Sequence, residues 1–514
     1  MKKILKEHPE KDIVIVAESL AFLLLADALA SGNDNNQVYK YGFNKERIRF
    51  FYRTGRSILG GYVKLLFLFI RYILTYTYCV HKDSNGLKKV SVIVDTYIFD
   101  NSFDKEGKFT NSYFSELHQF LWKSGIPVVI YPILFNIPFK RLKHIFKSIY
   151  QSKTKFLLLE DFLKPLDYLR VFFNTLQRLR CFEKVQDFMG IKIQPLVNEE
   201  NWVNLCSSNS ILSLLVNKLP KRLHERGVNP DVYINWSENQ TIHKAIISGM
   251  HKYFSKTKII GGKPFFPPLN HLNLFNTEKE RDFGYAPDKI VTCGKKLKNI
   301  FSTYDKDSHY DVGPSFRYGY LRKLTYNNHT HPGDISKHKV ISVILPQNIL
   351  FSRHILSSST RAIQNAIIKG WDIKVKMHPT HIKSEEAMLL KEYDMKSGCI
   401  ELTHEKMESL LPKSSAILTS ESGVTVEAIC LGIPVVAIGM PIGLDLNILD
   451  YLPSSMWKLA FTDDGIDLGL NKWALKHPLS SEERGEIGCK VLKDFFEKST
   501  NDSLQVYIES LQSI

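Results

Sequence analysis

Residues 418–434, LTSESGVTVEAICLGIP, contain the pattern that sets the fold class of this chain. A β-branched apolar run ends at Thr419, a polar loop covers residues 420–423, and a helical pattern follows and closes at Gly432. Glycine just after a helix is a common C-terminal cap, and a second apolar run begins at Pro434. A strand, a loop, a helix and another strand in this order predict one unit of a parallel α/β sheet.

Similar β-branched runs recur on both sides of this unit. They lie at residues 12–17, 90–95, 127–131, 231–235, 258–261 and 289–292, and again at 340–345, 372–377, 416–419 and 434–438. The polar stretch 324–338, which contains Pro332-Gly333, separates the two series and is typical of a linker. We therefore predict two doubly wound, Rossmann-like α/β domains that face each other across a cleft.

The predicted boundaries follow from these two series. The first domain is expected over residues 1–325 and the second over 335–480. Residues 481–514 have a helical pattern and are expected to pack back on the first domain.

Composition and charge restrict the class of protein. The chain has 514 residues, of which 44% are hydrophobic and 24% charged, as in ordinary globular proteins. The net charge of +15 fits three partners: nucleic acid, an anionic membrane, or an anionic substrate such as a nucleotide sugar. Lysine and arginine are spread along the whole chain, which disfavours a nucleic-acid-binding protein.

The cysteines indicate a reducing compartment. All seven are scattered and none forms a CxxC pair, which disfavours a disulfide framework or a zinc site. The first residues show no signal-peptide pattern. We expect a cytoplasmic protein.

The longest apolar stretch lies at residues 62–80 and is interrupted by Lys64 and Arg71. One interpretation is a buried helix. The other is a helix that lies on a membrane surface, with both cationic side chains reaching toward anionic headgroups. The basic, aromatic residues 47–53 precede it, so residues 45–80 form a candidate membrane-associating segment.

The loop 420–423 offers groups that bind phosphate. The hydroxyls of Ser420 and Ser422 and the backbone N–H groups near Glu421 and Gly423 stand at the start of a helix, where the helix dipole favours anions. In open α/β sheets ligands bind at the carboxyl ends of the strands. The alternative is an ordinary turn in which a serine caps the helix.

A second polar segment ends another predicted strand, at residues 371–380 (WDIKVKMHPT). His378 could donate a hydrogen bond to a leaving phosphate or protonate it, and Pro379 stiffens the loop before Thr380. Lys376 lies two residues earlier and faces the same way if the strand extends that far. The alternative is a histidine that merely caps a surface loop.

Together, the His-Pro pair and the pattern SES-G…VEA…LG-PVV resemble the donor-binding half of GT-B glycosyltransferases. They are most similar to the capsule and O-antigen group that includes CMP-Kdo transferases, CMP-sialic acid transferases and CDP-glycerol glycerophosphotransferases. The resemblance implies that His378, Ser420 and Ser422 contact the nucleotide phosphates and that Glu427 contacts the ribose. Thr419 stands where many GT-B enzymes have a second glutamate.

The first half resembles surface-carbohydrate biosynthesis proteins. Residues 235–245 (NWSENQTIHKA) match their E-N-Q loop, which includes Asn239 and Gln240, and residues 286–294 match their P-D-x-I-x-x-G motif. Lys263 stands where many relatives have a glutamine before a histidine, so the role of that histidine does not transfer.

A transferase also needs a base to deprotonate the acceptor hydroxyl. Glu238, just after a predicted strand, is the first candidate, and Asp95 is the alternative. Glu238 could instead be a first-turn helix residue. Arg317 could pair with an anionic sugar or phosphate, or with an acid at the domain junction.

These observations predict a metal-independent glycosyltransferase that needs no cofactor beyond its nucleotide-sugar donor. The chain has no P-loop, and Asp305-Lys306-Asp307 is interpreted as a solvated turn rather than a metal motif. A CMP-linked donor is favoured, and the acceptor is expected to be a lipid-linked or growing capsule or O-antigen glycan at the inner face of the plasma membrane. The alternatives are a CDP-glycerol-type phosphotransferase or a nucleotide-sugar epimerase on the same fold, and a basic nucleic-acid-binding protein.

Overall fold

A computed structural model gives the fold of this chain. It describes residues 19–31, 43–78, 90–104, 106–111, 113–135, 137–178, 184–187, 190–327, 339–381, 383–393, 400–440 and 444–511. The predicted strand at 12–17 and most of the predicted linker at 324–338 lie outside the described residues.

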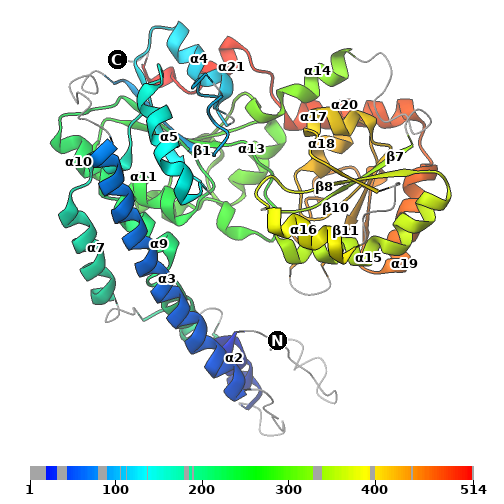
Figure 1. The fold of residues 1–514 in the computed structure, drawn as a ribbon, viewed down its shortest axis with the longest axis horizontal. Coiled ribbons are helices and arrows are strands. Elements are labelled where there is room, and N and C mark those ends of the chain that lie inside the picture. Colours follow the sequence, from blue (N-terminus) through cyan, green and yellow to red (C-terminus); the bar gives the residue numbers. More distant parts are fainter. Residues whose placement is uncertain are drawn as a thin grey trace. The chain divides into compact units, whose positions relative to one another are not determined.

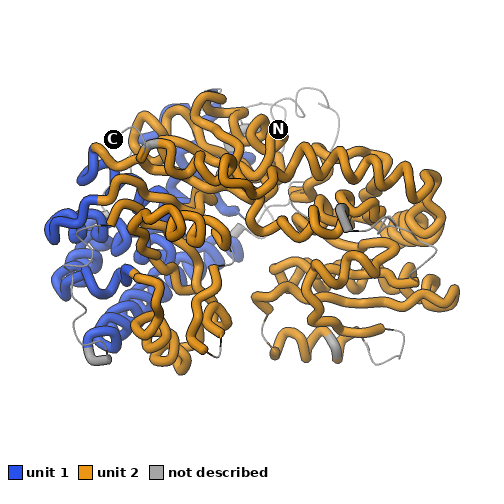
Figure 2. The backbone as a smooth tube through the Cα atoms, turned by 90° about the horizontal axis from the view of Figure 1, so that it is seen from above, with its two compact units in different colours: residues 1–88, 157–229, 241–255 blue, residues 89–156, 230–240, 256–514 orange. Residues whose placement is uncertain are grey.

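The chain divides into two compact units, coloured separately in Figure 2. Unit 1 contains residues 1–88, 157–229 and 241–255, and its described elements are helices. Unit 2 contains residues 89–156, 230–240 and 256–514, and it holds both β-sheets (Figure 1).

The first sheet of unit 2 has six parallel strands in the order β2-β1-β3-β4-β5-β6. The strands are β1 (Val92–Ile98), β2 (Val128–Leu134), β3 (Val232–Trp236), β4 (Lys258–Lys263), β5 (Lys289–Thr292) and β6 (Tyr310–Val312). Apolar side chains of β1 to β5 form one cluster with Leu117 and Leu121 of α4 (Ser115–Lys123). The other helices of this half are α5 (Phe139–Gln151), α12 (Glu278–Asp282), α13 (Lys295–Phe301) and α14 (Gly319–Asn327).

The second sheet also has six parallel strands, in the order β12-β11-β10-β7-β8-β9. They are β7 (Val340–Ile344), β8 (Asp372–Lys376), β9 (Ile400–Thr403), β10 (Ala416–Thr419), β11 (Val435–Ile438) and β12 (Trp457–Ala460). The helices of this half are α15 (Ile349–Ile368), α16 (Lys383–Glu392), α17 (Met407–Leu410), α18 (Val424–Cys430) and α19 (Asp463–Asp467). The predicted pair of doubly wound α/β sheets is confirmed.

The predicted glycine cap after α18 is present. Gly432 has φ +73, in the left-handed region that favours glycine, and a Cβ there would lie 3.2 Å from the backbone of Arg484. The chain can therefore turn directly from α18 into β11.

The C-terminal residues form two helices, α20 (Ser481–Phe495) and α21 (Asn501–Gln505). Phe495 and Phe496 join a core that includes residues of α13 and α18. Leu504 and Tyr507 pack on the first sheet, in the same cluster as Phe114.

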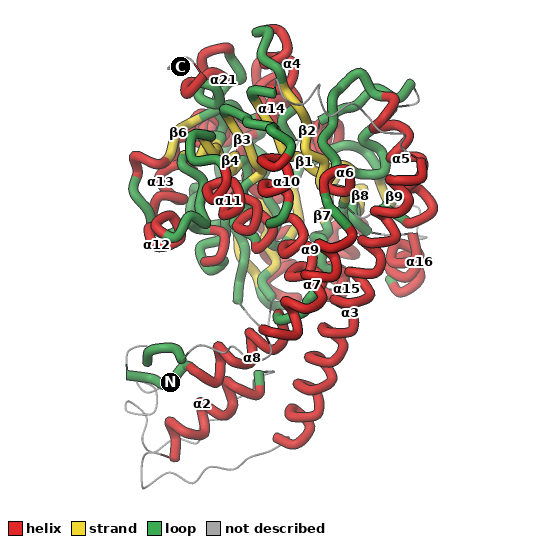
Figure 3. The backbone as a smooth tube through the Cα atoms, turned by 90° about the vertical axis from the view of Figure 1, so that its left-hand side faces the viewer, coloured by secondary structure: helices red, strands yellow, loops and turns green. Residues whose placement is uncertain are grey.

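Unit 1 is built around one long helix, α3 (Phe43–Tyr78). The other helices of the unit are α2 (Leu20–Ser31), α6 (Leu159–Phe162), α7 (Pro165–Arg178), α8 (Gln194–Asn204), α9 (Ser208–Val216), α10 (Leu219–Glu225) and α11 (Thr241–Tyr253), shown as red coils in Figure 3. By length and composition alone, α3 is long and apolar enough to cross a membrane, and only 28% of its most apolar stretch is buried.

Candidate functional site

Three neighbouring strands of the second sheet end beside one another. β7 lies between β10 and β8, and all three are parallel, so their carboxyl ends share one edge of the sheet. The loops after them contain residues 345–348, 377–381 and 420–423. From β7 the chain continues to β8 on one side of that strand and later returns to β10 on its other side. The edge where the strand order reverses in this way is the switch point at which ligands bind in open α/β sheets.

A cavity of about 890 Å³ opens at this edge. That volume is in the range of small-molecule sites in proteins. Segments that follow β4 and β6 of the first sheet line it from one side, and the three loops of the second sheet line it from the other. The polar lining residues are His271, Arg317, Tyr318, Tyr320, Gln347, Asn348, Lys376, His378, Glu421, Ser422 and Glu427.

The loop after β10 has an unusual backbone. Glu421 has φ +51, an uncommon conformation for a residue with a side chain, and its N–H donates to Asn447 Oδ1 at 2.9 Å. Ser422 Oγ accepts from the Val424 N–H at 3.2 Å, one residue before Gly423, the N-cap of the short helix α18. A Cβ on Gly423 would lie 3.1 Å from the Phe266 ring, so glycine permits the close approach of the aromatic wall.

Two polar groups of this loop have no hydrogen-bond partner among the described residues. They are Ser420 Oγ, which is fully buried behind the cavity lining, and Glu421 Oε1. Burial, and then the nearby Asp445 carboxylate, raise the pKa of Glu421 to about 7. Near neutral pH a large fraction of Glu421 is therefore uncharged and able to donate a hydrogen bond.

The contacts of His378 Nδ1 favour one tautomer of the ring. The Thr380 N–H donates to its Nδ1 at 3.3 Å, and Thr380 Oγ1 lies 2.7 Å from the same nitrogen. Burial, together with the charges of His381, Arg317 and Lys376, lowers the pKa of His378 to about 4. The neutral ring therefore carries its proton on Nε2, which makes it a hydrogen-bond donor rather than an acid at pH 7.

Two cations complete the polar lining. Lys376 ends β8, and burial lowers its pKa. Arg317 follows β6 and lies over the rings of Tyr113 and Tyr318, at 5.5 and 6.0 Å from their centroids. Its guanidinium forms no ion pair with any described residue. Both side chains are thus available to an anion in the cavity.

Glu427, the predicted ribose contact, lines the same cavity. One of its carboxylate oxygens accepts a hydrogen bond from Tyr320 Oη of α14. Burial raises its pKa.

The two candidate bases of the first sheet have different surroundings. Asp95 is fully buried and accepts from Tyr233 Oη at 2.8 Å and from the Trp236 N–H at 2.6 Å. Burial raises its pKa to about 7. Glu238 is partly exposed and accepts from Trp236 Nε1 at 2.7 Å and from Gln240 Nε2 at 2.6 Å. Burial raises the pKa of Glu238 as well, while Arg317 acts in the opposite sense.

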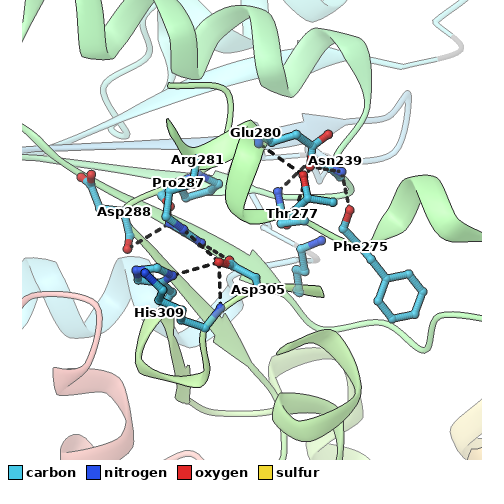
Figure 4. A network of polar contacts seen from close by, with 12 residues as sticks. Asn239, Phe275, Thr277, Glu280, Arg281, Pro287, Asp288, Asp305 and His309 are labelled. Atoms are coloured by element: carbon cyan, nitrogen blue, oxygen red, sulfur yellow. Dashed lines mark hydrogen bonds and ion pairs between the residues drawn. The ribbon is translucent and has the colours of Figure 1, made fainter. Parts of the chain in front are cut away.

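Two further candidates from the sequence support a loop (Figure 4). Asn239 has φ +56, and its amide donates to the backbone oxygens of Asn273 and Phe275, at 3.0 and 2.9 Å. Lys263 is fully buried, and its Nζ donates to Leu274 O at 2.5 Å. These contacts hold residues 273–275, and neither residue is part of the cavity lining.

The interpretation of residues 305–307 as a solvated turn is wrong at its first residue. The Asp305 side chain is fully buried and pairs with Arg281 at 2.5 Å and with His309 at 3.0 Å (Figure 4). Arg281, 24 positions earlier in the chain, neutralises the Asp305 carboxylate. No local sequence pattern indicates such a distant partner.

The structure thus brings together most of the predicted donor-site residues. Lys376, His378 and Pro379 line the cavity with the loop 421–423 and Glu427, and Arg317 joins them from the first sheet. Thr380 contacts His378, Ser420 lies behind the lining, and Glu238, Asp95, Asn239, Gln240 and Lys263 lie outside it. Sequence reasoning missed the aromatic wall, which consists of Phe265, Phe266, Tyr318, Tyr320 and Phe351. The sequence signal for all but Phe351 is the density of aromatic residues at 265–266 and 316–320.

Comparison with known proteins finds similarity only at the level of fold. No protein-family model matches the chain. No curated protein matches it by sequence. Among solved structures, the chain is similar to UDP-GlcNAc 2-epimerase from Neisseria meningitidis bound to UDP-GlcNAc, with 12% identity over 83% of this chain and 100% of that one and a TM-score of 0.48.

Two other solved structures show the same pattern. A glycosyltransferase from Rickettsia africae is 10% identical over 83% of this chain and 100% of that one, with a TM-score of 0.44. The wall teichoic acid polymerase TagF is 12% identical over 91% of this chain and 98% of that one, with a TM-score of 0.40. At these identities and TM-scores, no residue role passes from those proteins to this chain.

Proposed function

We propose that this protein is a glycosyltransferase of GT-B architecture that moves a sugar from a nucleotide-activated donor to a growing surface polysaccharide. The observation that carries the proposal is the cavity at the switch point, where Lys376, Arg317 and the Nε2–H of His378 converge with the loop 421–423. Cations and neutral donors around one cavity suit a phosphate-bearing ligand. A CMP-linked donor, a capsule or O-antigen acceptor and a cytoplasmic location are part of the same proposal, and they rest on the sequence resemblance.

The donor phosphate is proposed to lie against β8 and the loop after β10. Lys376 and Arg317 would balance its charge, while His378 Nε2–H and the Ser422 hydroxyl would donate hydrogen bonds. The neutral form of Glu421 would add a further donor. The aromatic side chains on the opposite wall, such as Phe266 and Tyr318, offer ring faces for a nucleobase.

The chemical step follows from this placement. The acceptor oxygen forms a bond to the anomeric carbon of the sugar, and the bond between that carbon and the phosphate oxygen breaks. The electron pair of the broken bond leaves with the nucleotide phosphate, where Lys376, Arg317 and His378 stabilise the added negative charge. Such stabilisation is usually the largest single contribution to catalysis.

Glu238 is proposed as the base that takes the acceptor proton. Its carboxylate is partly exposed, whereas Asp95 is fully buried and accepts two hydrogen bonds from its own sheet. Burial raises the pKa of Glu238, which makes its carboxylate a stronger base. We propose that Asp95 instead positions Trp236, which in turn donates to Glu238.

The proposal is tested by following the atoms of the donor. Purified protein is incubated with CMP-sugars, UDP-sugars or CDP-glycerol and an acceptor glycan, in buffer containing EDTA. A sugar in the glycan and free nucleotide in solution are expected. Donor phosphorus in the glycan would indicate a phosphotransferase, and an isomerised donor without nucleotide release would indicate an epimerase. Either product would overturn the glycosyltransferase proposal.

The nucleic-acid-binding alternative has its own test. A basic nucleic-acid-binding protein would bind DNA or RNA with an affinity that falls steeply as salt rises. We expect no such binding at physiological salt. Tight, salt-sensitive binding that competes with nucleotide would contradict the assignment of the cavity.

A further inference from the structure

The outward side of α3 is apolar along its second half. Val63 and Leu66 are each 59% exposed, and Leu59, Ile70, Ile73 and Tyr76 are exposed on the same side. These positions follow one another at intervals of three or four residues, so they form one stripe along the helix. The opposite stripe is buried inside unit 1, at Gly61, Leu65, Leu68, Arg71 and Thr75.

Helix α7 extends this apolar surface. It packs beside α3, with Tyr62 against Phe172 at 5.2 Å and Tyr72 against Tyr168 at 5.6 Å between ring centroids. Residue numbers rise along α3 as they fall along α7, so the two helices are antiparallel. Both helices belong to unit 1 and are labelled in Figures 1 and 3.

The exposed stripe of α7 faces the same way as that of α3. It contains Leu166, Leu169, Phe173 and Leu176, again at intervals of three and four. When each helix is viewed from its own N-terminus, its exposed stripe lies on the same rotational side of the residues that contact the other helix. Because the two helices are antiparallel, both stripes therefore lie on one side of the pair. We call this surface the α3–α7 face; it consists of the ten exposed apolar residues named in this and the first paragraph of the subsection.

The charges around the face are positive. The first half of α3 exposes Arg47, Arg49, Arg53 and Arg56, and α7 exposes Arg170. The two helices contain only two acidic residues, Glu46 and Asp167. Glu46 pairs with Arg49, Asp167 is buried against Arg222, and Arg53 pairs with Glu199 of α8. A partner for this surface must therefore offer apolar contact together with negative charge.

We propose that the α3–α7 face docks in the plane of an anionic lipid membrane. Apolar side chains would enter the boundary between headgroups and acyl chains, and the arginines would meet the lipid phosphates. Exposed Tyr76 and Phe173 are residue types that favour this boundary. This inference is independent of the proposed function, because it rests on unit 1 alone.

Two other arrangements fit less well. A helix that crosses the membrane would have to bring its opposite stripe into lipid, yet Arg71 of that stripe forms a buried ion pair with Glu160 of α6. A second copy of the chain, paired through the same face, would bring its arginines onto two helices whose described carboxylates, Glu46 and Asp167, are already paired.

The test uses the full chain and vesicles of two compositions, phosphatidylcholine alone and phosphatidylcholine with about one third phosphatidylserine. Cosedimentation should show binding to the anionic vesicles that weakens in high salt. Replacing Arg47 and Arg56 by glutamine should weaken it about fivefold for each arginine. The variants Val63→Ser/Leu66→Ser and, separately, Leu169→Ser/Phe173→Ser should each weaken binding tenfold or more.

The matched control is Ile368→Ser, an exposed apolar position of unit 2 that is 83% exposed. It should bind vesicles like the unchanged protein. The same melting temperature and nucleotide affinity in all variants would show that the fold and the cavity are intact. No binding to anionic vesicles, or a lipid-free dimer that the Val63→Ser/Leu66→Ser variant dissociates, would overturn the proposal.

Discussion

At the scale of single residues, the ionisation of Glu421 should set the pH dependence of nucleotide binding. Its pKa is raised to about 7, so the carboxyl is neutral below that pH and negative above it. A negative Glu421 repels a phosphate, so the dissociation constant should rise as pH increases through 7. Calorimetric titration of a nucleoside diphosphate from pH 6 to 8 would measure this.

The isosteric variant Glu421→Gln separates this effect from the titration of the nucleotide itself. Glutamine stays neutral, so the variant should bind with a weaker dependence on pH than the unchanged protein. Equal pH profiles for the two proteins would contradict the role given to Glu421.

Glu238 should affect turnover rather than donor binding. Glutamine at this position keeps the size of the side chain but cannot accept a proton, so Glu238→Gln should lower kcat by a factor of about 10² to 10⁴. The nucleotide dissociation constant should change little, because Glu238 does not line the cavity. A kcat within threefold of the unchanged protein would rule Glu238 out as the base.

The residues that line the cavity from the second sheet could be predicted to lie together because their signals are local. His378-Pro379 and the loop 420–423 each follow an apolar run, and parallel strands bring such ends to one edge. Arg317 could be predicted as an anion-binding residue, but its position could not, because that position depends on how the segment after β6 packs against the second sheet of unit 2. The partners of the Asn239 amide and the Arg281 partner of Asp305 lie more than twenty positions away in sequence, which a reading of local patterns does not reach.

At the scale of elements, the ion pair between Asp167 of α7 and Arg222 of α10 should be required for the packing of unit 1. Arg222 bonds Asp167 with two nitrogens, at 2.5 and 2.9 Å, and both side chains are buried. Arg222→Ala would leave a buried carboxylate unpaired, which costs about 3–5 kcal/mol. Urea unfolding should show a transition at lower denaturant concentration.

The matched control for this variant is Lys221→Ala on the same helix. Lys221 pairs with Glu225 at 3.9 Å, and both side chains are exposed, so its loss should cost no more than about 1 kcal/mol. Equal effects of the two variants would contradict the importance of the buried pair.

The sequence predicted the strands of both sheets better than the course of α3. Residues 62–80 were recognised as apolar and interrupted by charge, but the helix begins at Phe43. The spacing of apolar residues along α3 does not tell which of its two apolar sides packs against the other helices of unit 1. Only the packing of α6, α7 and α9 decides which stripe of α3 remains exposed.

In the molecule as a whole, the cavity of unit 2 is proposed to bind the nucleotide of an activated sugar. Elements of both sheets supply its walls, so the site exists only when unit 2 is complete. Neither the cations nor the aromatic wall would form a site alone. Binding should therefore stabilise unit 2 against heat and urea.

The most direct test is calorimetric binding of CMP, CDP, UDP and GDP to the purified protein and to the variant His378→Ala. The matched control is His404→Ala, whose side chain is 75% exposed and outside the cavity. We predict that at least one nucleotide binds, that His378→Ala weakens it about 10- to 100-fold through loss of a charge-assisted hydrogen bond, and that His404→Ala does not. No binding of any nucleotide, or equal binding by all three proteins, would contradict the proposal that the cavity is a nucleotide site.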